Sequence, residues 1–292
     1  MVHFAWASGS SIKERARLFY YAEIRPSLAY RGWSKYAPDR MVSFSIRAPA
    51  GRLFRVHMRD NMQDPETLAE FFSCQYTLIP PGQPPFEPKV VYDIGANIGI
   101  ASLYFATRFP KARFFGFEPV PANHRVCAMN FKNLTGGECF PWAVGAKSGR
   151  ANFDFNLADL RGGRLKGSSQ LARAGLERIE VPVFSIADLV ATERCPPPDF
   201  LKIDVEGAEV NVLCGLGGQV KNVNWILVET HGPSLEAGCR EWCLAHGFEV
   251  LRVHQQEPGF GALWCRRFRM GTVSNESLVP QVVMKQAARS LI

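Results

Sequence analysis

The sequence predicts an α/β protein with a doubly wound, largely parallel sheet, and two observations carry this prediction. From residue 89 onward, apolar β-prone segments alternate with segments of helical length, a rhythm typical of strand–helix–strand units. Several expected strands, such as "FLKID" at 200–204 and "WILVE" at 225–229, are continuous apolar runs. Such runs suit strands that helices cover on both faces of the sheet.

The N-terminal section precedes this alternation. Residues 11–30 can form a helix with several apolar positions, and residues 41–60 alternate around a Pro-Ala-Gly turn as expected of a hairpin. The stretch "DPETLAEFF" at 64–72 predicts another helix, with Asp64 as its cap. The proline-rich stretch 79–88 suits neither a helix nor a central strand, so we expect a connector there.

The main domain follows the connector. Its expected strands lie at 89–94, 113–117, 138–144, 150–155, 179–184, 199–203, 225–229, 248–254 and 261–267. Its expected helices lie at 98–108, 121–132, 185–191, 207–214 and 233–246. Residues 156–178 lack periodicity, so we expect a lid, a binding loop or a disordered segment. We divide the chain into a basic N-terminal extension (1–62), a main domain (63–268) and a C-terminal tail (269–292) with a peripheral helix.

The net charge of +7 over 292 residues is concentrated at the N-terminal end. Residues 1–60 contain eleven Lys and Arg against four Asp and Glu, so the rest of the chain balances. Such a section can attract an acidic partner or an anionic membrane surface. A solvated basic face without a partner is the alternative. We expect no nucleic acid as a partner.

Segments that would place the chain outside the cytoplasm are not evident. No run approaches the roughly 18 apolar residues of a membrane-spanning helix, and the first residues lack the pattern of a signal peptide. The eight cysteines are scattered and include no Cys-x-x-Cys pair, which favours reduced thiols. We therefore expect a cytoplasmic protein.

The stretch "VVYDIGANIGIAS" at 90–102 predicts a strand that enters a helix through a glycine turn. In doubly wound sheets, ligands bind at the carboxyl ends of strands beside such turns. A dinucleotide-binding turn has the pattern G-x-G-x-x-G, but Asn97 stands at the middle glycine between Gly95 and Gly99. Asp93, just before the turn, would repel a pyrophosphate but suits the amino group or sulfonium of S-adenosylmethionine. The turn therefore favours S-adenosylmethionine over a nicotinamide or flavin dinucleotide.

Charged side chains also follow three other strands. Glu118 ends the second strand, where a carboxylate can accept hydrogen bonds from both ribose hydroxyls of either ligand. Asp204 ends "FLKID", and Glu229 and His231 lie in "WILVETH", so all three should face the same crevice. Lys202 lies on the strand face of Asp204 and needs a partner such as Asp204 or Glu229.

The acidic residues after Asp204 have a plainer interpretation. Glu206 and Glu209 precede or begin an expected helix, where negative charge compensates the helix dipole. We prefer this interpretation for Glu209.

Together these motifs resemble the FkbM-type methyltransferase family. The resemblance rests on "VVYDIGANIGIAS", "FFGFEPVPANH", "WAVGAKSG", "VPVFSIADL", "FLKIDVEGAEVNVLCGL" and "ILVETHG", which occur in the family's order over roughly residues 60–235. It implies the Rossmann-like fold of class I methyltransferases and S-adenosylmethionine as cofactor. It further implies methylation, mostly on hydroxyl oxygens of sugars, glycans and other natural products.

The resemblance also implies roles for individual residues. In the cofactor site it places Asp93, Gly95, Asn97, Gly99, Glu118, Asn123, Ala143, Val144 and Asp204. The first four would line the methionine end, Glu118 would bind the ribose and Asn123 would approach the adenosine. Ala143 and Val144 would flank the adenine.

Methyl transfer to an alcohol also requires removal of the hydroxyl proton. His231 is the first candidate for the base, because imidazole titrates near neutrality, and Asp204, Glu229 and Lys202 are the other candidates. In the alternative interpretation, His231 only caps a loop. Asp204, Glu229 and His231 could instead bind Mg²⁺, but histidine is a poor ligand for that ion and we expect no metal.

Two further functions stay open from the sequence. One is a nicotinamide-dependent oxidoreductase. The other is a non-catalytic nucleotide-fold module whose basic N-terminal section binds RNA or a membrane. The sequence does not identify the acceptor.

Overall fold

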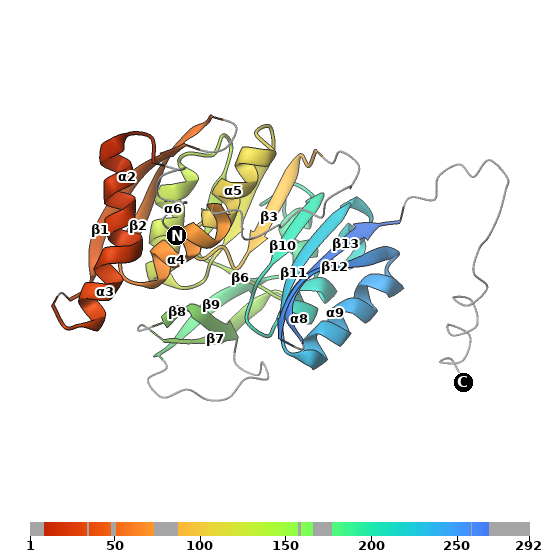
Figure 1. Ribbon diagram of the computed structural model, residues 1–292. Coiled ribbons are helices and arrows are strands. Elements are labelled where there is room, and N and C mark those ends of the chain that lie inside the picture. Colours follow the sequence, from red (N-terminus) through yellow and green to blue (C-terminus); the bar gives the residue numbers. More distant parts are fainter. Residues whose placement is uncertain are drawn as a thin grey trace, which may run out of the picture.

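The computed structural model describes residues 9–33, 35–47, 51–72, 87–156, 159–165, 177–257 and 259–268 (Figure 1). Its central feature is a seven-stranded sheet in the order β12-β13-β11-β10-β3-β4-β5. The strands are β3 (Val90–Ile94), β4 (Arg113–Phe117), β5 (Glu138–Phe140), β10 (Phe200–Ile203), β11 (Trp225–His231), β12 (Phe248–Glu257) and β13 (Phe260–Arg267). The strands from β11 to β5 in this order are parallel, and β13 is antiparallel to both of its neighbours.

The strand order places a topological switch at the centre of the sheet. From β3 the chain builds outward through β4 to β5, and it later returns to add β10 on the other side of β3. Ligands of doubly wound sheets bind at the carboxyl ends of strands at such a switch. The crevice is therefore expected at the ends of β3 and β10, and the predicted Rossmann-like fold is confirmed.

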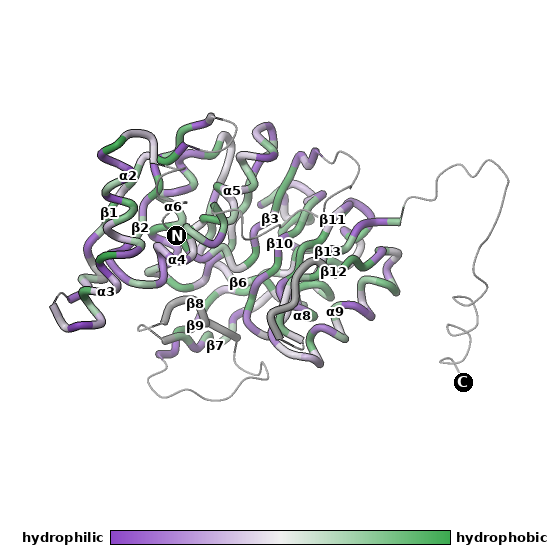
Figure 2. The backbone as a smooth tube through the Cα atoms, in the orientation of Figure 1, coloured by the Kyte–Doolittle hydropathy of each residue, from purple (hydrophilic) through white to green (hydrophobic). Residues whose placement is uncertain are grey.

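Helices cover both faces of this sheet. One face packs against α5 (Ile100–Arg108) and α6 (Pro121–Phe131), and the other packs against α7 (Ile186–Ala191), α8 (Glu209–Cys214) and α9 (Pro233–Ala245). Alternate residues of one strand enter the two cores, as Val91 and Tyr92 of β3 do. This two-sided burial explains the continuous apolar strand runs, and Figure 2 shows hydrophobic colour along the central strands.

A smaller, four-stranded sheet lies beside the main sheet and corrects several expectations. It has the order β6-β9-β7-β8, from β6 (Ala143–Val144), β7 (Gly149–Asn156), β8 (Asp159–Leu165) and β9 (Glu177–Phe184). The expected strand 138–144 is divided between the two sheets, with Pro141, which has no N–H for a ladder, at the break. The expected strands 150–155 and 179–184 belong to the smaller sheet. The expected loop 156–178 contains β8 and the start of β9.

The predicted N-terminal helix and hairpin are both present. The helical segment comprises α2 (Ile12–Phe19), a single π-helical stretch η1 (Tyr20–Ile24) and α3 (Arg25–Tyr30). The hairpin pairs β1 (Ala37–Arg47) with β2 (Leu53–Asp60), and α4 (Gln63–Phe72) follows. The assignment of Asp64 as the helix cap is wrong. The Asn61 side chain accepts the N–H of Asp64, whose own carboxylate is buried against the Arg59 guanidinium.

Other expectations concern the tail, the cysteines and membrane spans. The expected tail helix at 269–292 and most of the connector at 79–88 lie outside the described residues. Seven cysteines fall within the described part, and all seven are free thiols. Among the described residues, no helix combines the length and the apolar character that crossing a membrane requires.

The N-terminal hairpin shares one hydrophobic core with the main sheet. Phe44 and Val56 of the hairpin belong to the same buried cluster as Leu103 of α5. Two side chains of α6 or its end cover the outer edge of β2. Asn130 accepts from the N–H of His57 and donates to its carbonyl, and Asn133 pairs with Arg55 in the same way. The amides thus act as a short substitute for a pairing strand.

The turn between β3 and α5 is determined by backbone packing. Gly95, Asn97 and Gly99 all have positive φ, at 79°, 50° and 82°. A Cβ on Gly95 would lie 1.8 Å from the carbonyl oxygen of Asp204 at the end of β10. Gly95 is therefore required by the neighbouring chain segment.

Substitution of Asn130 tests how the hairpin is held. Asn130→Ala should lower the free energy of unfolding by at least about 2 kcal/mol, because it removes the bonds to His57 and to the buried Ile98 carbonyl. The control Asn133→Ala, at a partly exposed site, should cost less than half as much. Urea unfolding of both variants gives the comparison. Equal losses would show that Asn130 does not anchor the hairpin.

Substitution of Gly95 tests the turn. Gly95→Ala should destabilise the protein by more than the roughly 1–3 kcal/mol of a strained backbone, because the methyl group meets a carbonyl oxygen. Gly99→Ala is a matched control, since its φ is similar but its nearest neighbours are the Cys127 thiol and the Phe131 ring at 3.2 Å. Thermal and urea unfolding measure both losses. A Gly95 variant as stable as the Gly99 variant would contradict the proposed backbone constraint.

Candidate functional site

A cleft opens at the predicted place, over the carboxyl ends of β3, β4, β10 and β11. Many of the expected site residues line it: Gly95, Asn97, Glu118, Asn123, Ala143, Val144, Asp204, Glu229 and His231. The other three, Asp93, Gly99 and Lys202, are not among its lining residues. Asp93 and Lys202 are buried, and a Cβ on Gly99 would meet Cys127 and Phe131 of α6.

On the cofactor side of the cleft, Glu118 connects the turn between β3 and α5 to the turn between β4 and α6. Its Oε2 accepts the N–H of Asn97, and its Oε1 accepts the N–H of Val120, both at 2.9 Å. Burial raises the pKa of Glu118 to about 7, although these hydrogen bonds oppose the rise. Each carboxylate oxygen has a second acceptor position, so Glu118 can still bind hydroxyl groups that enter the cleft.

Lys202 lies under the cleft floor within a buried ionic network. Its ammonium is 3.1 Å from Asp204 Oδ2, 3.5 Å from Asp93 Oδ1 and 3.4 Å from the Gly95 carbonyl. Burial alone would lower the pKa of Lys202, but Asp204, Asp93 and Glu229 outweigh burial and raise it. This environment favours the charged form of Lys202, which suits a structural ion pair better than the role of a catalytic base.

Asp93 belongs to the same network. It is fully buried, accepts a hydrogen bond from Ser102 Oγ at 2.7 Å, and has a pKa that burial raises. Instead of touching the cleft, Asp93 connects the end of β3 to α5 and to Lys202. Its expected contact with the methionine end of the cofactor is therefore not seen in the lining of the cleft.

His231 is held by a buried carboxylate. Glu209, which is fully buried, lies 2.6 Å from His231 Nδ1 and also accepts the N–H of Gly207. The other ring nitrogen, Nε2, is 3.7 Å from both Asp204 Oδ1 and Glu206 Oε1. Burial alone would lower the pKa of His231, but these three carboxylates raise it to about 9. Glu209 therefore directs Nε2 toward the cleft.

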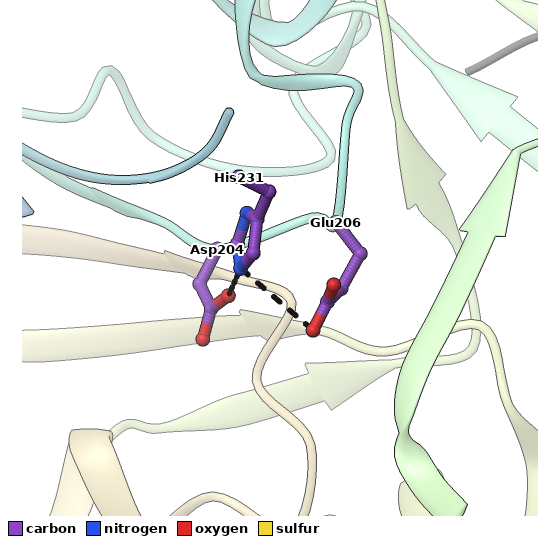
Figure 3. A group of neighbouring side chains, drawn as sticks. All are labelled: Asp204, Glu206 and His231. Atoms are coloured by element: carbon purple, nitrogen blue, oxygen red, sulfur yellow. Dashed lines mark ion pairs between the residues drawn. The ribbon is translucent and has the colours of Figure 1, made fainter. Parts of the chain in front are cut away.

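Asp204, Glu206 and His231 point toward one another in Figure 3. Their ligand atoms all lie within 4.8 Å of one another, so the three could hold a metal ion. Glu229, which the sequence grouped with Asp204 and His231 as a possible Mg²⁺ site, is not part of this set. It lines the cleft nearby, and burial together with Asp204 raises its pKa to about 8.

Several lining residues were missed from the sequence. The helix α4 contributes Thr67, Glu70 and Phe71, and β7 contributes Phe153. Helix α4 precedes the connector in sequence, so no local signal placed it beside the sheet. Glu209 had been interpreted as dipole compensation, but its burial and its contact with His231 show that it positions the imidazole. The sequence signal for the positioning role of Glu209 was His231, at the end of the following strand β11.

The match to a family model covers most of this region. Residues 93–259 match the model described as the methyltransferase FkbM domain. The matched segment begins at the glycine turn and extends past the strand that carries His231. It therefore contains all of the lining residues of the cleft except the three from α4, Thr67, Glu70 and Phe71.

Individual relatives are more distant. The chain is 29% identical over 145 residues to the hexuronic acid methyltransferase AglP of Haloferax volcanii, which covers 50% of this chain and 57% of that protein. It is 27% identical over 203 residues to the 31-O-demethyl-FK506 methyltransferase FkbM of Streptomyces tacrolimicus, which covers 59% of this chain and 76% of that protein. The match thus spans little more than half the length of the first relative.

Among solved structures, a methyltransferase FkbM from Methylobacillus flagellatus gives a TM-score of 0.46 at 17% identity. That alignment covers 63% of this chain and 45% of the other. The family model carries the assignment, because it spans more than half of the chain and contains most of the cleft. This protein belongs to the FkbM methyltransferase family.

Proposed function

We propose that this protein is an S-adenosylmethionine-dependent O-methyltransferase that methylates a hydroxyl of a sugar, a glycan or another natural product. The observation that carries the proposal is the pairing of two groups in one cleft. Glu118 offers a carboxylate on the cofactor side, and His231 presents Nε2 on the other side while Glu209 holds Nδ1. The cleft thus combines a place for a nucleoside with a candidate base.

The residues of the cofactor side fit S-adenosylmethionine. Glu118 would accept hydrogen bonds from the ribose hydroxyls, and the apolar Val144 and Ala143 would flank the adenine. Asn97 Oδ1 is buried and has no hydrogen-bond partner among the described residues, so it can accept from an amino group of the ligand. No pattern G-x-G-x-x-G occurs at the turn, which disfavours the dinucleotide of an oxidoreductase.

The chain's own part in the reaction is alignment and proton removal. The bound cofactor supplies an electrophilic methyl group. The walls of the cleft hold the acceptor hydroxyl in line with it and exclude water. His231 Nε2 takes the hydroxyl proton as the oxygen becomes nucleophilic, and Glu209 stabilises the imidazolium that results. Glu209 is therefore a positioning residue for this step.

The acceptor class is supported by the relatives. One relative is named for a hexuronic acid and another for a demethylated oxygen of FK506, and both names describe hydroxyl-bearing compounds. The carboxyl groups of Asp204, Glu206 and Glu229 near His231 can form hydrogen bonds with neighbouring hydroxyls of such an acceptor.

A substitution at Glu118 tests the cofactor assignment. Glu118→Gln should weaken binding of S-adenosylhomocysteine about 10- to 100-fold, because hydrogen bonds to a charged group contribute about 1.5–3 kcal/mol. In the wild type, affinity should fall as the pH drops below about 7, since the carboxylate then becomes protonated. Calorimetry measures both effects.

The matched control for Glu118 is Glu229→Gln. Glu229 has a pKa of about 8, so it is already mostly neutral at pH 7 and its amide variant should bind S-adenosylhomocysteine almost normally. A thermal-shift comparison with NAD completes the test, because a ligand stabilises the folded state that binds it. Stabilisation by NAD instead of S-adenosylhomocysteine would reject the proposed function.

Substitutions at His231 and Glu209 test the base. His231→Ala should lower turnover at least about 10²-fold with little loss of cofactor affinity. Because the neutral imidazole is the active form, kcat/KM of the wild type should rise with pH and level off above about 9. Glu209→Gln and the control Glu206→Gln each remove one negative charge, so both should shift this midpoint downward. Only Glu209→Gln should also lower the plateau, because it alone loosens Nδ1.

Chelation tests the metal alternative. Since Nε2 of His231 is assigned to proton transfer, exhaustive treatment with EDTA should leave turnover unchanged. The measurement is a methyl-transfer assay before and after dialysis against the chelator. Loss of turnover that Mn²⁺ or Mg²⁺ restores would replace the base with a metal bound to Asp204, Glu206 and His231.

A further inference from the structure

The outer face of the N-terminal helical segment carries apolar side chains that no core uses. Positions spaced by four residues, Ile12, Ala16, Tyr20 and Ile24, form a row along α2 and η1, and Ile12 is 77% exposed. The opposite side of the segment packs on the hairpin through the buried Leu18. The segment is therefore apolar on two sides. On the outer side Ile12, Ala16 and Ile24 are exposed, whereas the half-buried Tyr20 contacts Tyr21.

Two exposed aromatic residues lie further along the same stretch of chain. Tyr30 is 94% exposed at the end of α3, and Trp33 is 71% exposed in the following turn. Four of the nine exposed large apolar side chains among the described residues lie on the short stretch from Ile12 to Trp33. In Figure 1, α2 and α3 lie with β1 and β2 at the end of the molecule opposite β12 and β13. This face is therefore open to a large partner.

Exposed basic side chains lie at both ends of the row. Lys13 is beside Ile12, and Arg31 and Lys35 are beside Tyr30 and Trp33; all three are exposed. Arg25 and Arg59 are used internally, since they are buried against Asp60 and Asp64. Exposed positive charge thus accompanies the apolar row, and further exposed arginines lie on the hairpin (Arg40, Arg47 and Arg55).

We propose that this outer face docks on a bilayer surface that contains anionic lipids. Aliphatic side chains enter the boundary between headgroups and acyl chains, Trp and Tyr prefer the same depth, and Lys and Arg are attracted to anionic headgroups. RNA fits less well, because Ile12 and Ile24 cannot stack on bases. In addition, the Arg31 guanidinium already lies 5.3 Å from the centre of the Trp33 ring and covers one of its faces. The proposed docking is peripheral and reversible.

Vesicle binding by the full chain tests the proposal. The protein should sediment with vesicles of phosphatidylcholine and phosphatidylglycerol, should not sediment with vesicles of phosphatidylcholine alone, and should be released by salt. The double variant Arg31→Glu, Lys35→Glu should bind at least tenfold more weakly, since each basic residue near an anionic bilayer contributes roughly fivefold. The double variant Tyr30→Ser, Trp33→Ser should also bind more weakly.

Matched controls lie on another part of the chain. Leu244→Ser removes a similarly exposed apolar side chain from α9, and Lys221→Glu reverses an exposed charge on η2 (Gly217–Asn222); neither should change vesicle binding. Circular dichroism and stabilisation by S-adenosylhomocysteine show that each variant is folded. The proposal is overturned if the wild type does not bind anionic vesicles, or if the control substitutions weaken binding as much as the double variants do. It is also overturned if the face binds RNA in preference to vesicles, or if the double variants change only the oligomeric state.

Discussion

The crevice depends on the ion pairs that the buried ammonium of Lys202 makes with Asp93 and Asp204. Lys202 lies in the middle of β10, a strand covered on both faces, and it can stay charged there only because carboxylates surround it. Its partners come from the ends of two adjacent strands, Asp93 of β3 and Asp204 beyond β10. Removing one partner of a buried ion pair typically costs about 3–5 kcal/mol, so the two strand ends are held in register. The close contact between Gly95 and the Asp204 backbone strengthens the same junction.

This junction has consequences for the rest of the cleft. Asp204 is held by Lys202 on one side and lies 3.7 Å from His231 on the other, so its charge is shared between the buried network and the cleft. The imidazole is therefore pulled toward its charged form from one side by Asp204 and from behind by Glu209. A histidine acts as a base only in its neutral form, which these two carboxylates disfavour. A positively charged ligand beside the imidazole would favour the neutral form.

The sequence predicted those features whose causes are local. Apolar runs identified the buried strands, and the glycine turn, Glu118, Asp204 and His231 were placed because each lies at or just after the end of a strand. The smaller sheet was not predicted, because pairing among β6, β7, β8 and β9 depends on contacts across distant residues and on the break at Pro141. The pairing of Lys202 with Asp204 was also predicted, because a lysine inside an apolar strand needs a partner. Asp93 and Glu209 were located correctly along the chain, but their roles depend on burial, which the sequence pattern does not report. The contribution of α4 had no signal at all.

The N-terminal section and the cleft are joined by a chain of buried polar contacts. Arg59, at the end of β2, pairs with Asp64 of α4 and donates from its guanidinium to Asn123 Oδ1, and Asn123 lines the cleft. The hairpin also carries the helical segment whose outer face is apolar and basic. The segment proposed to meet the bilayer and the wall of the cleft are thus parts of one packed unit, so docking would fix the orientation of the cleft relative to the membrane. An acceptor held at that surface would then reach His231 from one constant direction, and such positioning reduces the entropy that the transfer step must overcome.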